Sequence, residues 1–168
     1  MNVTTLLRRF AVFVALLFLA IALVPAPAYA FKQYQVDYLR LNAVCYRCDL
    51  TAADLHGVDL HSAELDESNL AGADLNGTKL MDASLTGANL SGAKLRSADL
   101  TSANLSSANL TGASLVRANL SGANLLGAQL YEAKLGFANL KDALVDEGAL
   151  VGAQFYETTM PDGSIRNE

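Results

Sequence analysis

Large apolar residues recur at every fifth position through most of the chain, and a small residue stands two positions before each of them. The large residue is Leu at every fifth position from Leu50 to Leu140, and the series continues with Val145, Leu150, Phe155 and Met160. On an α-helix, five residues turn through about 500°, so successive leucines would never form a stripe. In a straight strand they would alternate between faces, so neither regular element can bury this pattern on one side.

The spacing inside each unit nevertheless favours extended backbone. Ala and Leu two positions apart, as in Ala103-Asn104-Leu105, share one face of an extended segment. If the other three residues turn a corner, the next pair faces inward again, and the chain winds into coils around its own axis. The pattern therefore predicts an all-β solenoid. A low-complexity segment that never folds would not need Leu in so strict a phase.

Glycine recurs at the expected corner, two residues after the large apolar residue. Its positions there are Gly57, Gly72, Gly77, Gly87, Gly92, Gly112, Gly122, Gly127 and Gly152, and Ser replaces it at Ser97, Ser102 and Ser107. A type II turn needs a positive φ at its third residue, where Gly has no steric penalty. Asn or Asp before the Leu can hydrogen-bond locally or form ladders between coils.

The Ala-(Asp/Asn)-Leu-x-x unit resembles the pentapeptide-repeat family over residues 48–160. That resemblance implies a right-handed quadrilateral β-helix, in which each unit forms one face and four units form one coil. It also implies inward Ala and Leu side chains, which agrees with the pattern. The segment would then form between five and six coils, with a length of roughly 25–30 Å at the usual strand spacing.

The first thirty residues have the layout of a secretory signal peptide. Two arginines precede an apolar run from Phe10 to Val24, and small residues follow at Ala28 and Ala30. As a helix the run is shorter than the hydrocarbon core of a membrane, although an uncleaved anchor is an alternative. We therefore assign residues 1–30 to a signal peptide and expect an exported protein with no stable membrane anchoring after its removal.

Residues 31–47 lack the repeat and form the predicted N-terminal cap. Their apolar residues stand at helical spacing: Phe31, Tyr34, Tyr38 and Leu41. We expect a short amphipathic capping α-helix over about residues 33–43, because an open solenoid end would expose leucines and strand edges. The alternative is an aromatic helix that docks on a partner or a membrane surface.

Residues 161–168 form the predicted C-terminal tail. Pro161, Asp162 and Gly163 are a turn signal that halts the winding. The Thr-Met-Pro-Asp-Gly ending resembles that of many cyanobacterial pentapeptide-repeat proteins. The Cys-x-x-Cys-Asp-Leu entry into the repeats is similar to lumenal members of the cyanobacterial and plastid branch, so the resemblance implies the thylakoid lumen or the periplasm.

The charge of the chain argues against nucleic acid or anionic lipid as a partner. Without residues 1–30, ten Lys and Arg face seventeen Asp and Glu, a net charge of −7. The acids crowd the first coils, between Asp49 and Asp82, and a second group follows between Glu132 and Glu157. The middle coils are almost neutral.

Cys45 and Cys48 stand directly before the first repeat, and Cys48 occupies a position where Ala is usual. In an exported protein two such cysteines are expected to form a disulfide, which would tie the cap to the solenoid. A redox-responsive pair, free thiols and a metal site remain alternatives. The sequence lacks the βαβ setting of a thioredoxin-like site and further zinc ligands at suitable spacing.

No motif for catalysis accompanies the repeat. The chain has no nucleophile elbow, no phosphate loop and no Ser/His/Asp set with plausible geometry. A narrow solenoid filled by its own leucines also leaves no cavity for a substrate. His56 and His61 stand among acids, but on diverging faces, so we expect no enzyme, no cofactor and no metal site.

Outward apolar residues are few and gather late in the repeats. Stacking twenty residues per coil places Val116, Gly136 and Tyr156 in one column, with Phe137 beside it, and Tyr131 and Val151 in a column on the neighbouring face. An exposed apolar strip on polar walls can mark a contact site, although scattered exposure without meaning is the alternative.

We therefore expect a non-enzymatic exported repeat protein whose walls form a structural or protein-interaction surface, with another protein as partner. The resemblance also offers a rival function, that of a DNA mimic that binds a type II topoisomerase. The export signal, the acids gathered at the ends and the lack of a dimerising C-terminal helix count against that function. A lumenal redox-responsive protein acting through Cys45 and Cys48 is a further alternative.

Overall fold

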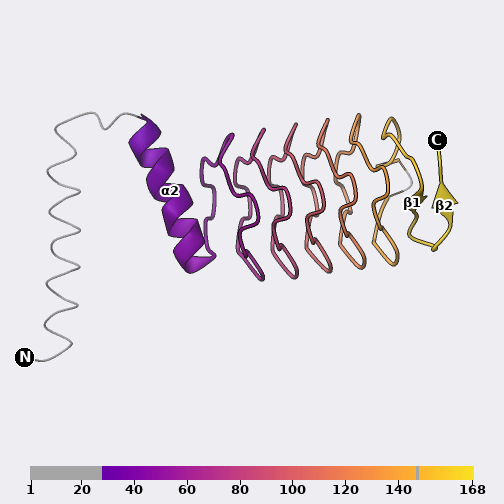
Figure 1. Cartoon of the computed structure of the whole chain (residues 1–168), viewed down its shortest axis with the longest axis horizontal. Coiled ribbons are helices and arrows are strands. Elements are labelled where there is room, and N and C mark those ends of the chain that lie inside the picture. The colour runs from indigo at the N-terminus through magenta and orange to yellow at the C-terminus, as the bar shows by residue number, and fades with distance from the viewer. Residues whose placement is uncertain (1–27, 147) are drawn as a thin grey trace, which may run out of the picture. The chain divides into compact units, whose positions relative to one another are not determined.

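The computed structural model describes residues 28–146 and 148–168, and residues Gln35–Glu168 form one compact unit. The elements are helix α2 (Ala28–Asn42) and two short strands, β1 (Thr158–Thr159) and β2 (Ile165–Arg166). Between Asn42 and β1 the chain winds in successive coils (Figure 1). Within the described residues, no helix has the length and apolar character needed to cross a membrane.

The coils are joined by parallel pairing between residues twenty positions apart. The bridges run from Val44↔Glu64 to Asn139↔Thr159, always with this register. The inward Leu residues from Leu50 to Leu140, except Leu130, donate their backbone N–H to the coil that follows, as Leu55 does to Asp74 over 2.8 Å. Asp74 in turn donates to the carbonyl of Ala53 in the coil before it, over 2.9 Å. Four five-residue units therefore make one coil, and each coil depends on its neighbours for its hydrogen bonds.

The inward Ala and Leu positions form one apolar core along the axis of the coils. Every Leu at a fifth position from Leu50 to Leu140 is at most 1% exposed. Burial of one such side chain contributes about 1.5–3 kcal/mol, and a coil alone would leave its leucines open above and below. The inward orientation predicted from the sequence is confirmed for these residues.

The corners adopt the backbone conformation that the glycines predict. In the turn from Leu55 to Val58, Gly57 is the third residue and has a φ of 64°. Ser102 stands at an equivalent corner and accepts the same left-handed conformation with a φ of 57°. The Asx residues act as expected too, since the Asn104 side chain accepts a hydrogen bond from the N–H of Ser106 over 3.1 Å.

Helix α2 begins and packs differently from the prediction. It starts at Ala28 rather than near residue 33, and the buried residues are Val36 and Leu39. Tyr38 and Leu41 are exposed, at 43% and 84%, so the aromatic stripe does not form the packing face. The spacing of the aromatic residues was misleading because Val36 and Leu39, on another face of α2, are the residues buried against the core.

Side chains of α2 replace hydrogen bonds that a preceding coil would have made. The Oε1 atom of Gln35 accepts the N–H of Asp49 over 3.0 Å, and Arg40 donates to the carbonyl of Asp54 over 2.6 Å. The coil also begins earlier than predicted, since pairing starts at Val44 rather than at Cys48. The predicted signal peptide lies outside the described residues up to residue 27, and its last three residues, 28–30, open α2.

The coil that ends the repeat, residues 144–160, is irregular. Ala149 lies in a turn and makes no bridge with Gln129, although Lys134 and Gln154 pair again in the usual register. The Asp146 side chain, instead of a backbone carbonyl, accepts the N–H of Gly127. Leu144 and Ala149 replace the usual Asx residues, so no side-chain oxygen holds the turn that follows either of them.

The predicted tail folds back as a hairpin on one face of this coil. Strand β2 pairs antiparallel with β1, with Thr159 opposite Ile165, and Arg166 lies over the ring of Phe155 at 4.1 Å. Gly163 turns the chain with a φ of 83°. The hairpin covers one edge, but Leu150 and Met160 remain only partly buried.

Candidate functional site

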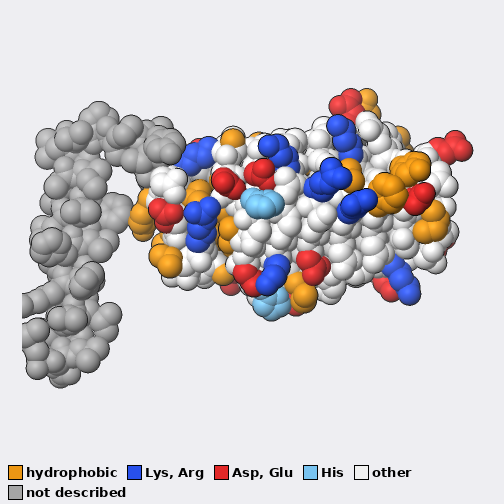
Figure 2. Space-filling model, in the orientation of Figure 1, with side chains coloured by type: hydrophobic (Ala, Val, Ile, Leu, Met, Phe, Trp, Pro, Cys, Tyr) orange, Lys and Arg blue, Asp and Glu red, His pale blue; other side chains and the backbone are white. Residues whose placement is uncertain are grey.

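The apolar strip predicted from the sequence lies on the coils nearest the hairpin. Phe137 is 43% exposed and Tyr156 is 54% exposed, while Val116 is half-buried. The backbone N–H of Phe137 donates to the carbonyl of Tyr156, which fixes these two residues on adjacent coils. Figure 2 shows hydrophobic side chains gathered towards this end of the coils, on an otherwise mostly polar wall.

The two rings of this strip contact each other. Phe137 and Tyr156 pack edge to face, with ring centroids 5.0 Å apart. The guanidinium of Arg117, one coil earlier, lies 5.5 Å from the centroid of the Phe137 ring. Aromatic pairs and cation–π contacts of this kind hold exposed rings in a defined orientation. Arg117, Phe137 and Tyr156 therefore form a fixed group on the surface, which we call the aromatic corner.

Tyr131 and Val151 form a second exposed group on the neighbouring face. Their exposed fractions are 58% and 70%. The Tyr131 ring lies over Gly152, where an added Cβ would come within 2.5 Å of the ring. Only glycine leaves room for the tyrosine in this position.

A hollow of about 440 Å³ lies beside Tyr131 and is open to solvent. Its lining includes Gln129, Leu130, Ala149 and Val151. It exists because the irregular coil 144–160 departs from the wall where Ala149 would otherwise pair with Gln129. The sequence predicted the exposed residues but not the hollow, which depends on this local loss of pairing.

Cationic residues, Arg117 among them, line up along the coils that lead to the aromatic corner, and the sequence analysis missed this alignment. Lys94, Ser114, Lys134 and Gln154 pair in series along one column, and Arg96 lies one corner position further on, in line with Val116 and Tyr156. Lys94, Arg96, Arg117 and Lys134 are all exposed. The twenty-residue register could have found them, had it been applied to charged as well as apolar residues.

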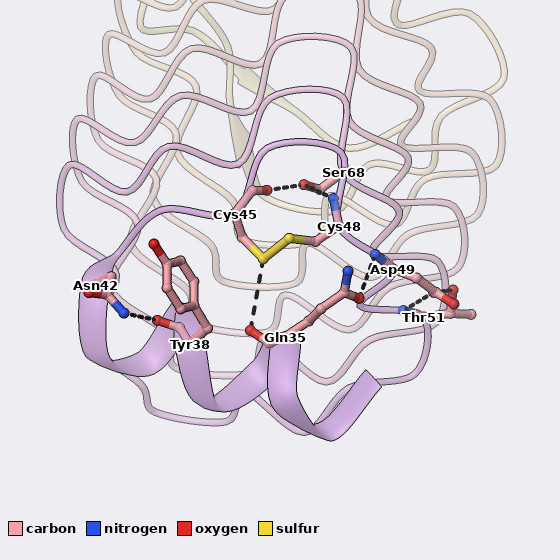
Figure 3. The surroundings of a disulfide bond; sticks show 8 residues. All are labelled: Gln35, Tyr38, Asn42, Cys45, Cys48, Asp49, Thr51 and Ser68. Carbon is pink, nitrogen blue, oxygen red and sulfur yellow. Dashed lines mark hydrogen bonds between the residues drawn. A yellow bond between two sulfur atoms is a disulfide. The ribbon is translucent and has the colours of Figure 1, made fainter. Parts of the chain in front are cut away.

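A disulfide bond joins Cys45 and Cys48 beside α2 (Figure 3). Cys45 is 3% exposed and its Sγ lies 3.8 Å from the carbonyl oxygen of Gln35 in α2. Ser68 of the next coil donates to the carbonyl of Cys45 and accepts the N–H of Cys48. The disulfide thus contacts both the helix and the second coil, at the end of the apolar core.

Ion pairs concentrate in the first coils of the described part of the chain. Glu67 accepts hydrogen bonds from Arg47 over 2.6 Å and from Tyr46 over 2.9 Å. The Arg47 hydrogen bond, followed by that of Tyr46, holds the pKa of Glu67 below its ordinary value. The hydrogen bond from Lys79, and then the N–H of His61, lower the pKa of Asp59 in the same way. Glu67 and Asp59 therefore each form side-chain hydrogen bonds that link one coil to the next on the surface.

Within the described residues, no cluster of three or more His, Cys, Asp or Glu has the arrangement of a metal site. His56 and His61 each follow an Asp whose side chain accepts the backbone N–H of the histidine. These contacts belong to the corner geometry of the repeat.

Comparison with known proteins supports the repeat. A family model described as pentapeptide repeats (8 copies) matches residues 43–82, 63–101, 78–116, 98–136 and 108–146. No curated protein sequence matches the chain.

Solved structures of repeat proteins resemble the fold. A pentapeptide repeat protein, Rfr23, from the cyanobacterium Cyanothece 51142 is 30% identical, with 72% of this chain and 97% of that one covered, at a TM-score of 0.58. QnrB1, a plasmid-mediated fluoroquinolone resistance protein, is 22% identical, with 62% and 61% covered, at a TM-score of 0.52. These likenesses imply a right-handed quadrilateral β-helix.

A third structure comes from the thylakoid lumen of Arabidopsis thaliana and is also a pentapeptide repeat protein. It is 25% identical, with 74% of this chain and 85% of that one covered. Its TM-score is 0.33, so this likeness carries no argument about where the present chain is located.

Proposed function

Because the chain belongs to the pentapeptide repeat family, whose members are generally structural or interaction proteins rather than enzymes, we propose that it binds another protein through its wall. The binding surface is the aromatic corner together with Tyr131 and Val151. The observation that supports this most directly is the fixed, exposed Phe137–Tyr156 pair on an otherwise polar wall.

Aromatic rings are suited to this role. Tyr, Phe and Arg are enriched in protein interfaces, and rings already held in place lose little conformational entropy on binding. Phe137 is held by Tyr156 and Arg117, and Tyr131 is held over Gly152. The neighbouring hollow gives a partner side chain a place to enter.

Cross-linking of the exported protein in extract, followed by mass spectrometry, tests this function. Variants Tyr131→Ser and Tyr156→Ser should lose a protein that the wild type captures, because each removes an exposed ring. Tyr46→Ser is the matched control, since Tyr46 is also 54% exposed but lies on the first coil. Capture of the same protein at equal yield by all four forms would remove the proposed surface.

The DNA-mimic alternative receives less support from the arrangement of charge. A mimic needs a continuous acidic surface, but Lys94, Arg96, Arg117 and Lys134 interrupt the acids along the aromatic corner. The sequence identity to QnrB1, 22%, supports a shared fold but not a shared function. Failure of the purified protein to alter DNA supercoiling by a type II topoisomerase would agree with this preference.

The proposal includes export to the thylakoid lumen or periplasm, on the strength of the arginine pair, the apolar run and the small residues before Phe31. It also includes a structural Cys45–Cys48 disulfide, as expected in such a compartment. Mass measurement of the native protein with and without reductant and alkylation would report both processing and cysteine state. A cytosolic chain that keeps Met1 and free thiols would contradict both parts.

A further inference from the structure

Four cations follow one corner of the coils and lead to the aromatic pair. Lys94 and Lys134 belong to the column of paired residues described above. Arg96 lies one coil before Val116 in the neighbouring column, and Arg117 lies one coil before Phe137. Figure 2 shows blue side chains grouped next to the orange patch on this face. We call this surface, with Phe137 and Tyr156, the basic strip.

The strip is unusual in this chain because the whole sequence carries a net charge of −5. The column that contains Lys94 and Lys134 has acids in its first two coils, Asp54 and Asp74. Lys94 lies 3.6 Å from Asp74, so its charge is partly neutralised. Arg96, Arg117 and Lys134 form no ion pair with another described residue.

We propose that the basic strip binds an extended, acidic polypeptide segment whose apolar side chains rest on Phe137 and Tyr156. This inference rests on the proposed function and names the chemistry of its partner. Carboxylates of the segment pair with Arg96, Arg117 and Lys134, and the rings supply the apolar contact. The three coil spacings from Lys94 to Gln154 span about 15 Å, the length of about five extended residues.

A polypeptide fits the strip better than a nucleic acid does. Acids lie at both of its ends, at Asp74 and at Glu157, which follows Phe137 by one coil. A phosphate backbone carries a charge at every step and would be repelled there, whereas a polypeptide can place its carboxylates only opposite the cations. The edge-to-face ring pair also leaves no parallel faces between which a base could stack.

Amide chemical shifts of the ¹⁵N-labelled mature protein provide the test. The probe is a synthetic peptide of about eight residues in which Glu alternates with Phe and Leu. The comparison peptide has Lys in place of each Glu. The acidic peptide should shift amides around Lys94–Tyr156 along the strip, and its affinity should fall as salt is raised, because the contacts are exposed.

Lys134→Glu and Lys141→Glu form a matched pair of variants. Both lysines are exposed and lie in the same coil, but Lys141 stands at a different corner. We expect Lys134→Glu to weaken binding of the acidic peptide roughly three- to tenfold, and Lys141→Glu to change it far less. Retained protection of backbone amides in both variants shows that the fold is intact.

Several results would overturn the inference. They are equal binding of the two peptides, equal effects of the two variants, and no shifts along the strip at millimolar acidic peptide. Preferential binding of single-stranded DNA or of phosphatidylserine vesicles would assign the strip to another class of partner. If cross-linking captures a protein that is lost with Tyr156→Ser but kept with Lys134→Glu, the protein-binding function stands and the acidic partner does not.

Discussion

The coils from residue 44 to residue 143 and the coil from residue 144 to residue 160 are built from the same five-residue unit but differ in completeness. In the first region, each described coil pairs with the next, and every inward Leu is at most 1% exposed. In the second region, Ala149 does not pair with Gln129, and Leu150 is only partly buried. The first region therefore has the more complete pairing and core packing. The hollow and several exposed apolar side chains lie in the second region or next to it.

The two ends of the core differ in the same sense. At the beginning, Gln35 and Arg40 replace the hydrogen bonds of a missing coil, and Leu39 covers the axis. At the other end, β2 covers one edge, and the N–H groups of Leu150 and Phe155 have no backbone acceptor among the described residues. The first end of the core is thus closed by α2 side chains, whereas the last coil leaves inward residues such as Leu150 partly exposed.

The largest expected effect follows from placing charge in the regular region. Leu105→Asp combined with Leu110→Asp should abolish folding, because two unpaired carboxylates would be buried among leucines of three coils. The observable is the loss of β-rich circular dichroism and of a cooperative melting transition. Unchanged dichroism and melting temperature would contradict the inward position of these leucines.

A milder pair of substitutions measures the difference between the regions. Leu105→Ala should lower the free energy of unfolding by about 2–5 kcal/mol, since it leaves a cavity in a filled core. Leu150→Ala should cost about 1 kcal/mol, because its side chain already contacts solvent. Urea denaturation of the two variants gives both values. Equal losses would show that the last coil is packed as tightly as the rest.

The regular region follows directly from the sequence because one short rule is repeated there. Leu at every fifth position, Ala two before it and Gly or Ser at the corner specify each coil separately, and the pairing then repeats. The packing face of α2 was predicted wrongly, because Tyr34, Tyr38 and Leu41 outnumber the two residues that are buried, Val36 and Leu39.

Local exceptions were harder to predict than the repeat. Leu144, Gly148 and Ala149 look like minor variations of the unit, but together they remove two Asx side chains and one inward methyl group. The hollow beside Tyr131 lies where Ala149 does not pair with Gln129, whereas Leu144 still pairs with Asn124. The alignment of Lys94, Arg96, Arg117 and Lys134 appears only when all residue types are placed on the twenty-residue register.

Restoring the unit in the last coil should reduce the difference. The triple variant Leu144→Asn, Gly148→Ala and Ala149→Asn returns the Asx side chains and the inward methyl group. No atom lies within 4 Å of a Cβ added at Gly148, so the alanine fits. We expect a gain of about 1–2 kcal/mol in unfolding free energy. A loss of stability would show that the irregular backbone has another cause.

The smallest expected effect concerns the surface of the first coils. The Arg47 and Tyr46 hydrogen bonds lower the pKa of Glu67, so their stabilisation is present above the unfolded pKa and is lost as the pH falls through the folded pKa. The melting temperature should therefore fall slightly less in Glu67→Gln than in the wild type when the pH is lowered from 7 to about 3. Glu132→Gln, an exposed glutamate on a later coil, is the control. Identical acid sensitivity of Glu67→Gln and wild type would remove the role of this contact.

Hydrogen exchange of individual backbone amides tests the comparison most directly, because both regions are measured in one unmodified protein. The account predicts slow exchange for the inward residues Leu55 to Leu140, whose N–H groups bond to a following coil, except at Leu130 beside the hollow. It predicts fast exchange for Leu150 and Phe155. Uniform protection from Leu55 through Phe155 would contradict the division into a stable repeat and an open, accessible end.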